Sequence, residues 1–150
     1  MSGELYRDVV LDHNRAPRNF GTLPAHTHAA DGANPMCGDQ LRVEAVIDDG
    51  RIAALRFSGE SCAITTAAAS MLGELVAGAD AASLAALRAR FETMLAAAPD
   101  APEDPALGAL NALAELKRYP ARWKCALLPF ATLRAALEGD ARATTEAGSA

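Results

Sequence analysis

The sequence predicts an α+β fold in which a small antiparallel β-sheet packs against about five helices. Residues 41–47 alternate apolar and polar side chains almost strictly, and the small or apolar set Ala53, Leu55 and Phe57 alternates with polar residues after Asp49-Gly50. Alternation of this kind is typical of strands with one buried face, and Asp-Gly is a strong hairpin signal. The helices are predicted by apolar residues at helical spacing between proline and glycine breaks.

The first helix is expected over residues 3–13, with Ser2 as its cap. Residues 14–35, which contain several prolines and glycines, are expected to form a long loop. After the hairpin, four more helices are expected: from Thr65 or Thr66 to about Ala77, from Asp80 or Ser83 to about Ala97, from Asp104-Pro105 to about Lys117, and from Ala121 or Cys125 to Glu138. Residues 140–150 are expected to be a flexible tail.

The register of the hairpin is predicted from the requirement that one face stays apolar. A two-residue turn at Asp49-Gly50 sets Arg42 opposite Phe57, which mixes the two faces. A three-residue loop over residues 48–50 sets Leu41 opposite Phe57 instead and keeps the buried face apolar. We therefore expect the three-residue loop.

Bulk properties limit the class of protein. The chain has 150 residues, which suits one domain over residues 1–150, and its net charge is −5. It has no run of basic residues, so we expect no nucleic-acid partner. It also has no apolar run near 18 residues, the length of a membrane span, and no N-terminal signal peptide, so we expect a cytoplasmic protein without a membrane partner.

The three cysteines, Cys37, Cys62 and Cys125, are poor disulfide candidates in a reducing compartment. The predicted register sets Cys37 opposite position 61, beside Cys62, and Asp39 points to the same side as Cys37 because side-chain direction repeats every two residues in a strand. Cys125 lies near a helix start, where free N–H groups lower a thiol pKa.

Together these four residues suit zinc or an iron–sulfur cluster. The alternatives are that each cysteine is a small buried hydrophobe and that Asp39 only accepts local N–H bonds. His26 and His28 in the long loop are weaker metal candidates, and His13 is expected near the end of a helix.

Five segments resemble the U-type iron–sulfur cluster assembly scaffold family, which comprises IscU, SufU and the N-terminal domain of NifU. They are residues 5–13 (LYRDVVLDH), 16–21 (APRNFG), 34–39 (NPMCGD), 57–71 (FSGESCAITTAAASM) and 124–128 (KCALL).

The resemblance implies a SufE/NifU-like fold with about three antiparallel strands. It implies that Cys37, Cys62 and Cys125 bind metal or a transient iron–sulfur cluster, and that Asp39 keeps the cluster labile. It also implies that Cys37 accepts persulfide sulfur, that a SufS-like cysteine desulfurase is the sulfur donor and that apo iron–sulfur proteins are the acceptors.

Three departures from the IscU branch point to the SufU branch. Lys124 stands where IscU has histidine, the Leu-Pro-Pro-Val-Lys chaperone-docking motif is absent, and the interval between Cys62 and Cys125 is longer by about one helix. A further departure is Ser61, where the family commonly has glycine.

Three functions remain open at the level of the sequence. The leading hypothesis is a scaffold for transient cluster assembly in a SUF-type system. The alternative is an enzyme, a zinc-dependent sulfurtransferase in which zinc is bound by three cysteines and Asp39. A purely structural zinc is the third hypothesis, and the Asp39 ligand argues against it because closed structural sites use Cys and His.

Overall fold

The computed structural model of the protein describes residues 3–145 and, within them, the side chains of residues 6–145. The elements follow in the order α1 (Gly3–Arg15), β1 (His28–Asn34), β2 (Asp39–Asp48), β3 (Arg51–Glu60), α2 (Ala63–Leu75), α3 (Ala81–Ala96), the 3₁₀ segments η1 (Pro105–Arg118) and η2 (Pro120–Arg122), α4 (Trp123–Leu137) and β4 (Arg142–Thr144). None of the helices in this part of the chain is long and apolar enough to cross a membrane. The predicted cap of the first helix, Ser2, lies outside the described residues.

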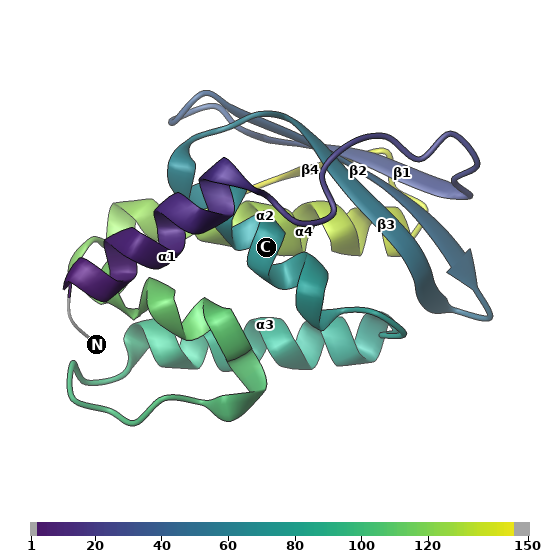
Figure 1. Cartoon of the computed structure of the whole chain (residues 1–150). Coiled ribbons are helices and arrows are strands. Elements are labelled where there is room, and N and C mark those ends of the chain that lie inside the picture. Colours follow the sequence, from purple (N-terminus) through teal and green to yellow (C-terminus); the bar gives the residue numbers. More distant parts are fainter. Residues whose placement is uncertain (1–2, 146–150) are drawn as a thin grey trace.

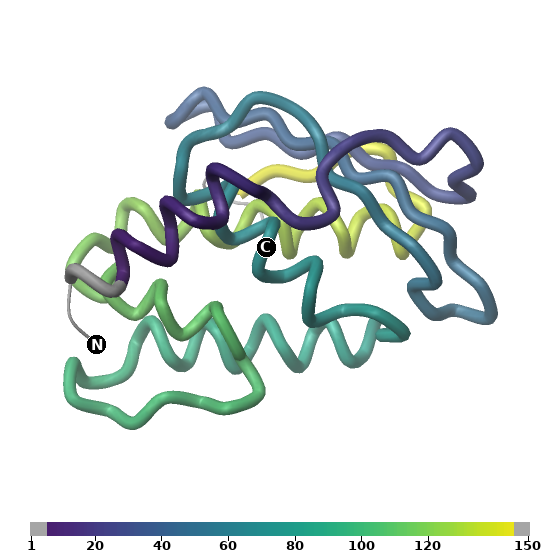
Figure 2. The backbone as a smooth tube through the Cα atoms, viewed as in Figure 1, coloured from purple at the N-terminus to yellow at the C-terminus, as the bar shows by residue number. Residues whose placement is uncertain are grey.

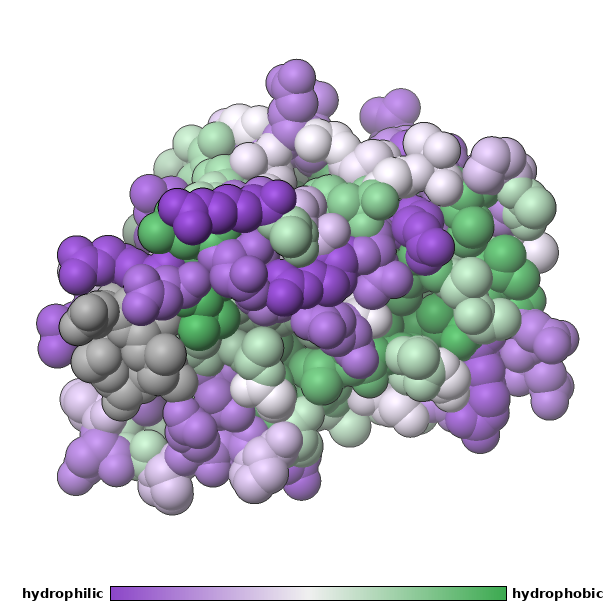
Figure 3. Space-filling view, in the orientation of Figure 1, coloured by the Kyte–Doolittle hydropathy of each residue, from purple (hydrophilic) through white to green (hydrophobic). Residues whose placement is uncertain are grey.

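The helices lie on one side of the sheet (Figure 1). α4 and α2 form the layer directly beneath the sheet, with α4 packed on β1 and β2. α3 and η1 form a further layer beyond α2 and α4, and α1 packs against α2 and η1. In the space-filling view, hydrophilic side chains form a band where α1 lies (Figure 3). This arrangement of one sheet packed against layers of helices confirms the α+β prediction.

The sheet has four strands in the order β3-β2-β1-β4, rather than the three that were expected. β1 lies inside residues 14–35, where we expected only a loop. Its sequence is rich in alanine and poor in β-branched residues, so the strand depends on its neighbours rather than on propensity. It pairs antiparallel with β2, parallel with β4, and packs on α4.

The expected flexible tail was wrong for residues 142–144, which form the edge strand β4. Arg142 pairs with Asp31, and Thr144 pairs with Ala33. The turn after α4 is closed by the Asp140 N–H, which donates to the Ala135 carbonyl at 2.8 Å. The following residue is then joined to β1, because the Asp31 N–H donates to the Ala141 carbonyl at 2.8 Å. Residues 146–150 of the expected tail lie outside the described residues.

The predicted hairpin register was also wrong, although Leu41, Val43, Leu55 and Phe57 lie on the buried face as predicted; the prediction failed for Ala53. The turn has two residues, Asp49 (φ 52°) and Gly50 (φ 75°), which is the type I′ geometry that fits the twist of the strands. A bulge then shifts the register between Val46 and Ile47 and leaves Ala53 unpaired. Ala53 is exposed. Because the bulge adds one residue to β3, residues on the buried face of β2 again lie opposite residues on the buried face of β3 beyond it.

The core lies beneath the sheet and between the helices. Phe57 of β3 is fully buried, and Phe91 of α3 stacks on Phe130 of α4 with ring centroids 5.4 Å apart. Asp80 caps α3, as one of the two alternatives predicted, and Asp104 caps η1 as predicted. η1 is a 3₁₀ segment with a non-helical residue at Gly108 rather than the regular helix that was expected.

Gly59 of β3 is expected to tolerate no side chain. Its φ is +120°, and an added Cβ would overlap the backbone oxygen of Gln40 on the neighbouring strand. We expect Gly59→Ala to lower the free energy of unfolding by about 2–4 kcal/mol, because backbone strain and a clash with rigid backbone add. Urea unfolding of the metal-free protein measures the change.

Gly78→Ala is the matched control for this substitution. Gly78 also has positive φ, but no heavy atom lies within 4 Å of the added Cβ. The free energy of unfolding of the control variant should therefore fall only by the conformational cost of positive φ, about 1 kcal/mol. Equal losses in the two variants would contradict the clash with the Gln40 backbone.

Candidate metal centre

Cys37 lies in the turn of residues 35–38 that joins β1 to β2. The turn is closed by the strand pair Asn34–Asp39, and the Cys37 N–H donates to the Asn34 carbonyl at 3.1 Å. Of the three cysteines, Cys37 is the exposed one. It is therefore the thiol that a reactant or a partner protein reaches most directly.

Asp39 is the first residue of β2 and is only 1% exposed. Its Oδ1 accepts the Cys62 N–H at 2.7 Å, and its Oδ2 accepts the Thr65 hydroxyl at 2.9 Å. A buried carboxylate is costly without such bonds. Because a carboxylate has about four acceptor positions, two bonds leave room for a metal ligand interaction.

Cys62 is the N-cap of α2, and its sulfur accepts the Thr65 N–H at 3.5 Å. The prediction that Thr65 or Thr66 caps this helix was wrong, because the helix begins directly after Cys62, at Ala63. Cys62 is half-buried, and its Sγ lies 3.8 Å from Asp39 Oδ2. The start of α2 therefore joins Cys62 to Asp39.

The thiols meet in a different way from the one that the predicted register implied. The pairing of β2 with β3 ends at Gln40 opposite Glu60, so Asp39 rather than Cys37 is the neighbour of Cys62. Cys37 instead approaches Cys125, and the two sulfurs lie 3.3 Å apart.

Cys125 lies in the first turn of α4, as predicted, and is fully buried. Asn34 Nδ2 donates to its sulfur at 3.8 Å, while Asn34 Oδ1 is buried without a hydrogen-bond partner among the residues that the structure describes. Thr65 Oγ1 lies 3.0 Å from the Cys125 carbonyl oxygen, a second acceptor for its hydroxyl proton besides Asp39. The sheet therefore contacts the Cys125 thiol, and α2 contacts the Cys125 backbone.

The structure brings three of the four predicted site residues into one group of candidate ligands. One ligand atom each of Cys37, Asp39 and Cys125 lies within 4.8 Å of the other two. Cys62 joins this group through its contact with Asp39. In a tetrahedral zinc–thiolate site two sulfurs lie about 3.8 Å apart, so the 3.3 Å between the Cys37 and Cys125 sulfurs is close to the spacing that zinc requires.

The sulfurs also shift one another's pKa. A hydrogen bond from Cys125 lowers the pKa of Cys62 to about 6, against the effect of burial, and Thr65 adds to the lowering. The expectation that the helix start lowers the pKa of Cys125 was wrong: this pKa is raised, first by that same bond to Cys62 and then by burial. Cys62 is therefore the first of this pair to become a thiolate, the form that binds metal.

Arg122 is a site residue that the sequence analysis missed. A hydrogen bond to Cys125, together with the charges of Cys125 and Cys62, raises the pKa of its guanidinium. It is the N-cap of α4 and precedes Cys125 by about one helical turn, so the two residues lie on one face of the helix start.

The histidines that were considered as metal ligands lie apart from this group. His26 Nδ1 is 2.6 Å from the Leu23 carbonyl and 3.5 Å from Glu44 Oε2, and His28 Nδ1 is 2.8 Å from the Thr27 hydroxyl. The only group of three or more possible metal ligands among the described residues contains neither of them.

His13 is buried in α1 and forms a 2.7 Å hydrogen bond with the Ser70 hydroxyl of α2. Burial, assisted by Arg18, lowers the pKa of His13 below its ordinary 6.5. The unfolded chain therefore takes up this proton more readily than the folded chain, and folding stability falls as the pH drops below 6.5. We expect the urea midpoint to fall more in the wild type than in His13→Gln between about pH 7 and pH 5.

His13→Gln is the matched comparison for the wild type, because glutamine can keep a hydrogen bond to Ser70 but does not titrate. The other ionisable groups are the same in both proteins, so the difference between the two pH profiles isolates His13. Parallel pH profiles would contradict the buried, neutral state of this histidine.

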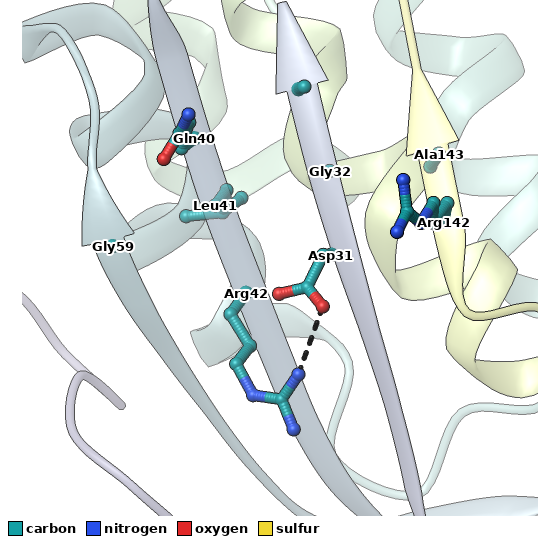
Figure 4. A pocket seen from close by; sticks show the side chains of 9 residues that line it. Asp31, Gly32, Gln40, Leu41, Arg42, Gly59, Arg142 and Ala143 are labelled. Carbon is teal, nitrogen blue, oxygen red and sulfur yellow. Dashed lines mark hydrogen bonds and ion pairs between the residues drawn. The ribbon is translucent and has the colours of Figure 1, made fainter.

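A separate hollow of about 410 Å³ lies on the outer face of the sheet and is lined by no cysteine. Its side chains include Asp31 and Arg42, which form an ion pair at 3.1 Å (Figure 4). Gln40 also lines it, whereas the preceding Asp39 points inward. Alternation along β2 therefore keeps this hollow and the thiol group on opposite faces of the sheet.

The chain matches a family model for the NifU-like N-terminal domain over residues 5–126. This chain belongs to the NifU-like N-terminal domain family. The match extends from α1 to the start of α4 and so includes Cys37, Asp39, Cys62 and Cys125. The U-type resemblance inferred from the five segments is confirmed.

Similar proteins place this NifU-like chain near SufU and IscU. It is 34% identical over 129 residues to the zinc-dependent sulfurtransferase SufU of Bacillus subtilis (strain 168), a match that covers 86% of each chain. It is 32% identical over 139 residues to the scaffold protein IscU of Streptococcus pyogenes serotype M1, covering 93% of this chain and 86% of the relative.

A solved structure with the same fold is that of a candidate SUF-system scaffold protein from Fervidobacterium islandicum AW-1. It superposes with a TM-score of 0.78 at 26% sequence identity and covers 91% of this chain and 99% of that one. Both the SufU and the IscU branches are therefore represented among the relatives of this NifU-like chain.

Proposed function

We propose that this NifU-like chain is an iron–sulfur cluster assembly scaffold of a SUF-type system. In this function Cys37, Asp39, Cys62 and Cys125 bind metal or a nascent cluster, which then passes to apo iron–sulfur proteins. The observation that carries the proposal is that ligand atoms of Cys37, Asp39 and Cys125 lie within 4.8 Å of one another. The third thiol, Cys62, forms a 3.8 Å hydrogen-bond contact with the Asp39 carboxylate.

The mixed donor set suits transient rather than permanent binding. Thiolates are the usual ligands of iron–sulfur clusters, and a carboxylate oxygen is a harder, weaker partner for the same iron. Cys37 lies on an exposed turn, so one side of the site is open to a receiving protein. The cluster is cargo here, and a labile oxygen ligand favours its release.

A second function, zinc-dependent sulfur transfer, is favoured by the unequal exposure of the thiols. Cys62 and Cys125 are half-buried and buried, whereas Cys37 is exposed. Zinc bound by Cys37, Asp39, Cys62 and Cys125 would keep the three cysteine sulfurs as thiolates at neutral pH. The relative named as a zinc-dependent sulfurtransferase supports this alternative.

In sulfur transfer the Cys37 thiolate is the acceptor. Its sulfur attacks the outer sulfur of a persulfide on a cysteine desulfurase, a new S–S bond forms on Cys37, and the donor's S–S bond breaks. The bonding pair leaves with the donor cysteine as a thiolate. Arg122, beside the sulfurs, offers a fixed positive charge to the negative persulfide that results.

One anaerobic experiment separates the two functions. The purified protein is analysed for bound zinc and iron, then supplied with iron, cysteine and a SufS-like cysteine desulfurase. A chromophore that forms and then moves to an apo-ferredoxin supports the scaffold. If zinc persists, no chromophore forms and desulfurase turnover rises, the scaffold proposal fails and sulfur transfer is supported.

Asp39→Ala tests both functions against a purely structural metal. Asp39 is buried, so the variant is compared first for folding by circular dichroism. A change in cluster yield or in sulfur transfer with the fold retained supports a working site. Loss of the fold in both Asp39→Ala and Cys37→Ser would favour a structural zinc instead.

A further inference from the structure

Thr65 lies at the centre of the thiol group although it is not a candidate ligand. It belongs to the first turn of α2 and is fully buried. Its hydroxyl is 2.9 Å from Asp39 Oδ2, 3.0 Å from the Cys125 carbonyl oxygen and 3.4 Å from Cys62 Sγ. One hydroxyl thus contacts three of the four site residues.

We propose that Thr65 is a positioning residue that sets how tightly Asp39 binds the metal, an inference that rests on the proposed metal-binding function. Asp39 Oδ1 is fixed by a backbone group, the Cys62 N–H, which no side-chain substitution removes. Oδ2 accepts the Thr65 hydroxyl at 2.9 Å, and its other contact, with Cys62 Sγ, is longer at 3.8 Å. The orientation of the carboxylate therefore depends on this hydroxyl.

The Thr65 hydroxyl has a single proton for two oxygen acceptors. When it donates to Asp39 Oδ2 it holds the carboxylate, and when it donates to the Cys125 carbonyl it ties α2 to α4. Thr65 thereby couples the position of Asp39 to that of Cys125. Partners of this kind, one step away from the ligands, typically contribute 10–100-fold to metal affinity.

Thr65→Val tests this role because valine keeps the buried volume and removes the hydroxyl. Zinc affinity is measured on the full chain by competition with a chromophoric chelator, without any desulfurase. We expect zinc binding to weaken by about tenfold or more, and Thr65→Ser to restore most of the affinity. Cobalt(II) titration, followed through the d–d bands of the bound metal, gives a second readout, of the ligand field.

Thr66→Val is the matched control. Thr66 is the next residue of the same helix, and its hydroxyl pairs with Ser61 Oγ at 3.0 Å rather than with Asp39. Its zinc affinity should stay within about twofold of the wild type. If Thr65→Val does not fold, Thr65→Ala provides the same comparison, with a small cavity in place of a misplaced methyl group.

Positioning is separated from a general structural effect by a double-mutant cycle. If Thr65 acts through Asp39, Thr65→Val should weaken zinc binding by less than about threefold in an Asp39→Ala background. A full-size effect in that background, or unchanged affinity in Thr65→Val alone, overturns the proposal. A wild-type chain that binds neither zinc nor cobalt overturns the metal centre itself, an outcome visible before any variant is compared.

Discussion

Replacing Cys37 with serine is expected to abolish sulfur acceptance by this chain, to below about 1% of the wild type. Cys37 is the exposed thiol of the site, and a serine hydroxyl is not ionised at neutral pH and does not displace a persulfide. The measurement is mass spectrometry of the intact chain after incubation with a cysteine desulfurase and cysteine. The wild type should gain one sulfur atom and Cys37→Ser none.

Met36→Leu is the control for this prediction, because Met36 is the exposed neighbour of Cys37 in the same turn. It should accept sulfur at close to the wild-type rate. If Cys37→Ser still gains a sulfur atom and Cys62→Ser does not, the acceptor is Cys62. That assignment would fit its pKa of about 6 and would overturn the role given to the exposed thiol.

The largest stability effect is expected for Phe57→Ala. Phe57 is fully buried in β3, and its ring centroid lies 6.0 Å from that of Phe20. The segment after α1 runs beside β3 (Figure 2). The Phe57 backbone holds it there, since its N–H donates to the Asn19 carbonyl at 2.7 Å and its carbonyl accepts the Gly21 N–H at 2.8 Å. We expect the free energy of unfolding to fall by about 3–5 kcal/mol, measured by urea unfolding of the metal-free protein.

Leu11→Ala is the control, because Leu11 is a large hydrophobic residue that is 49% exposed on α1. Its substitution should change the free energy of unfolding by no more than about 0.5 kcal/mol. A loss below about 1 kcal/mol in Phe57→Ala would mean that the sheet edge repacks around the missing ring.

The register of the hairpin could not be predicted from the sequences of its two strands alone. The alternation of apolar side chains correctly placed Leu41, Val43 and Phe57 on the buried face. The same rule rejected a two-residue turn, because it could not foresee the bulge that leaves Ala53 unpaired. A bulge depends on the twist that the whole sheet adopts, and no single strand records it.

The site was predicted in its members and only partly in its geometry. Cys37, Asp39, Cys62 and Cys125 were singled out by residue type, spacing and family resemblance. Their arrangement differs from the prediction, because Asp39 rather than Cys37 is the neighbour of Cys62. Arg122 and Thr65 were missed as site residues, because an arginine near a helix start and a threonine in a first helical turn are common and carry no chemical signal of their own.

The sequence by itself determined the α+β class, the helical segments, the buried face of the hairpin and the residues with the chemistry to bind metal, because side-chain periodicity and residue type are local properties. Only the tertiary structure decided that the alanine-rich β1 and the short β4 join the sheet, since strands without intrinsic propensity form through their neighbours. It also decided which sulfur meets which partner. Such contacts depend on how α2 and α4 begin beneath the strand ends, and that follows from packing over the whole core.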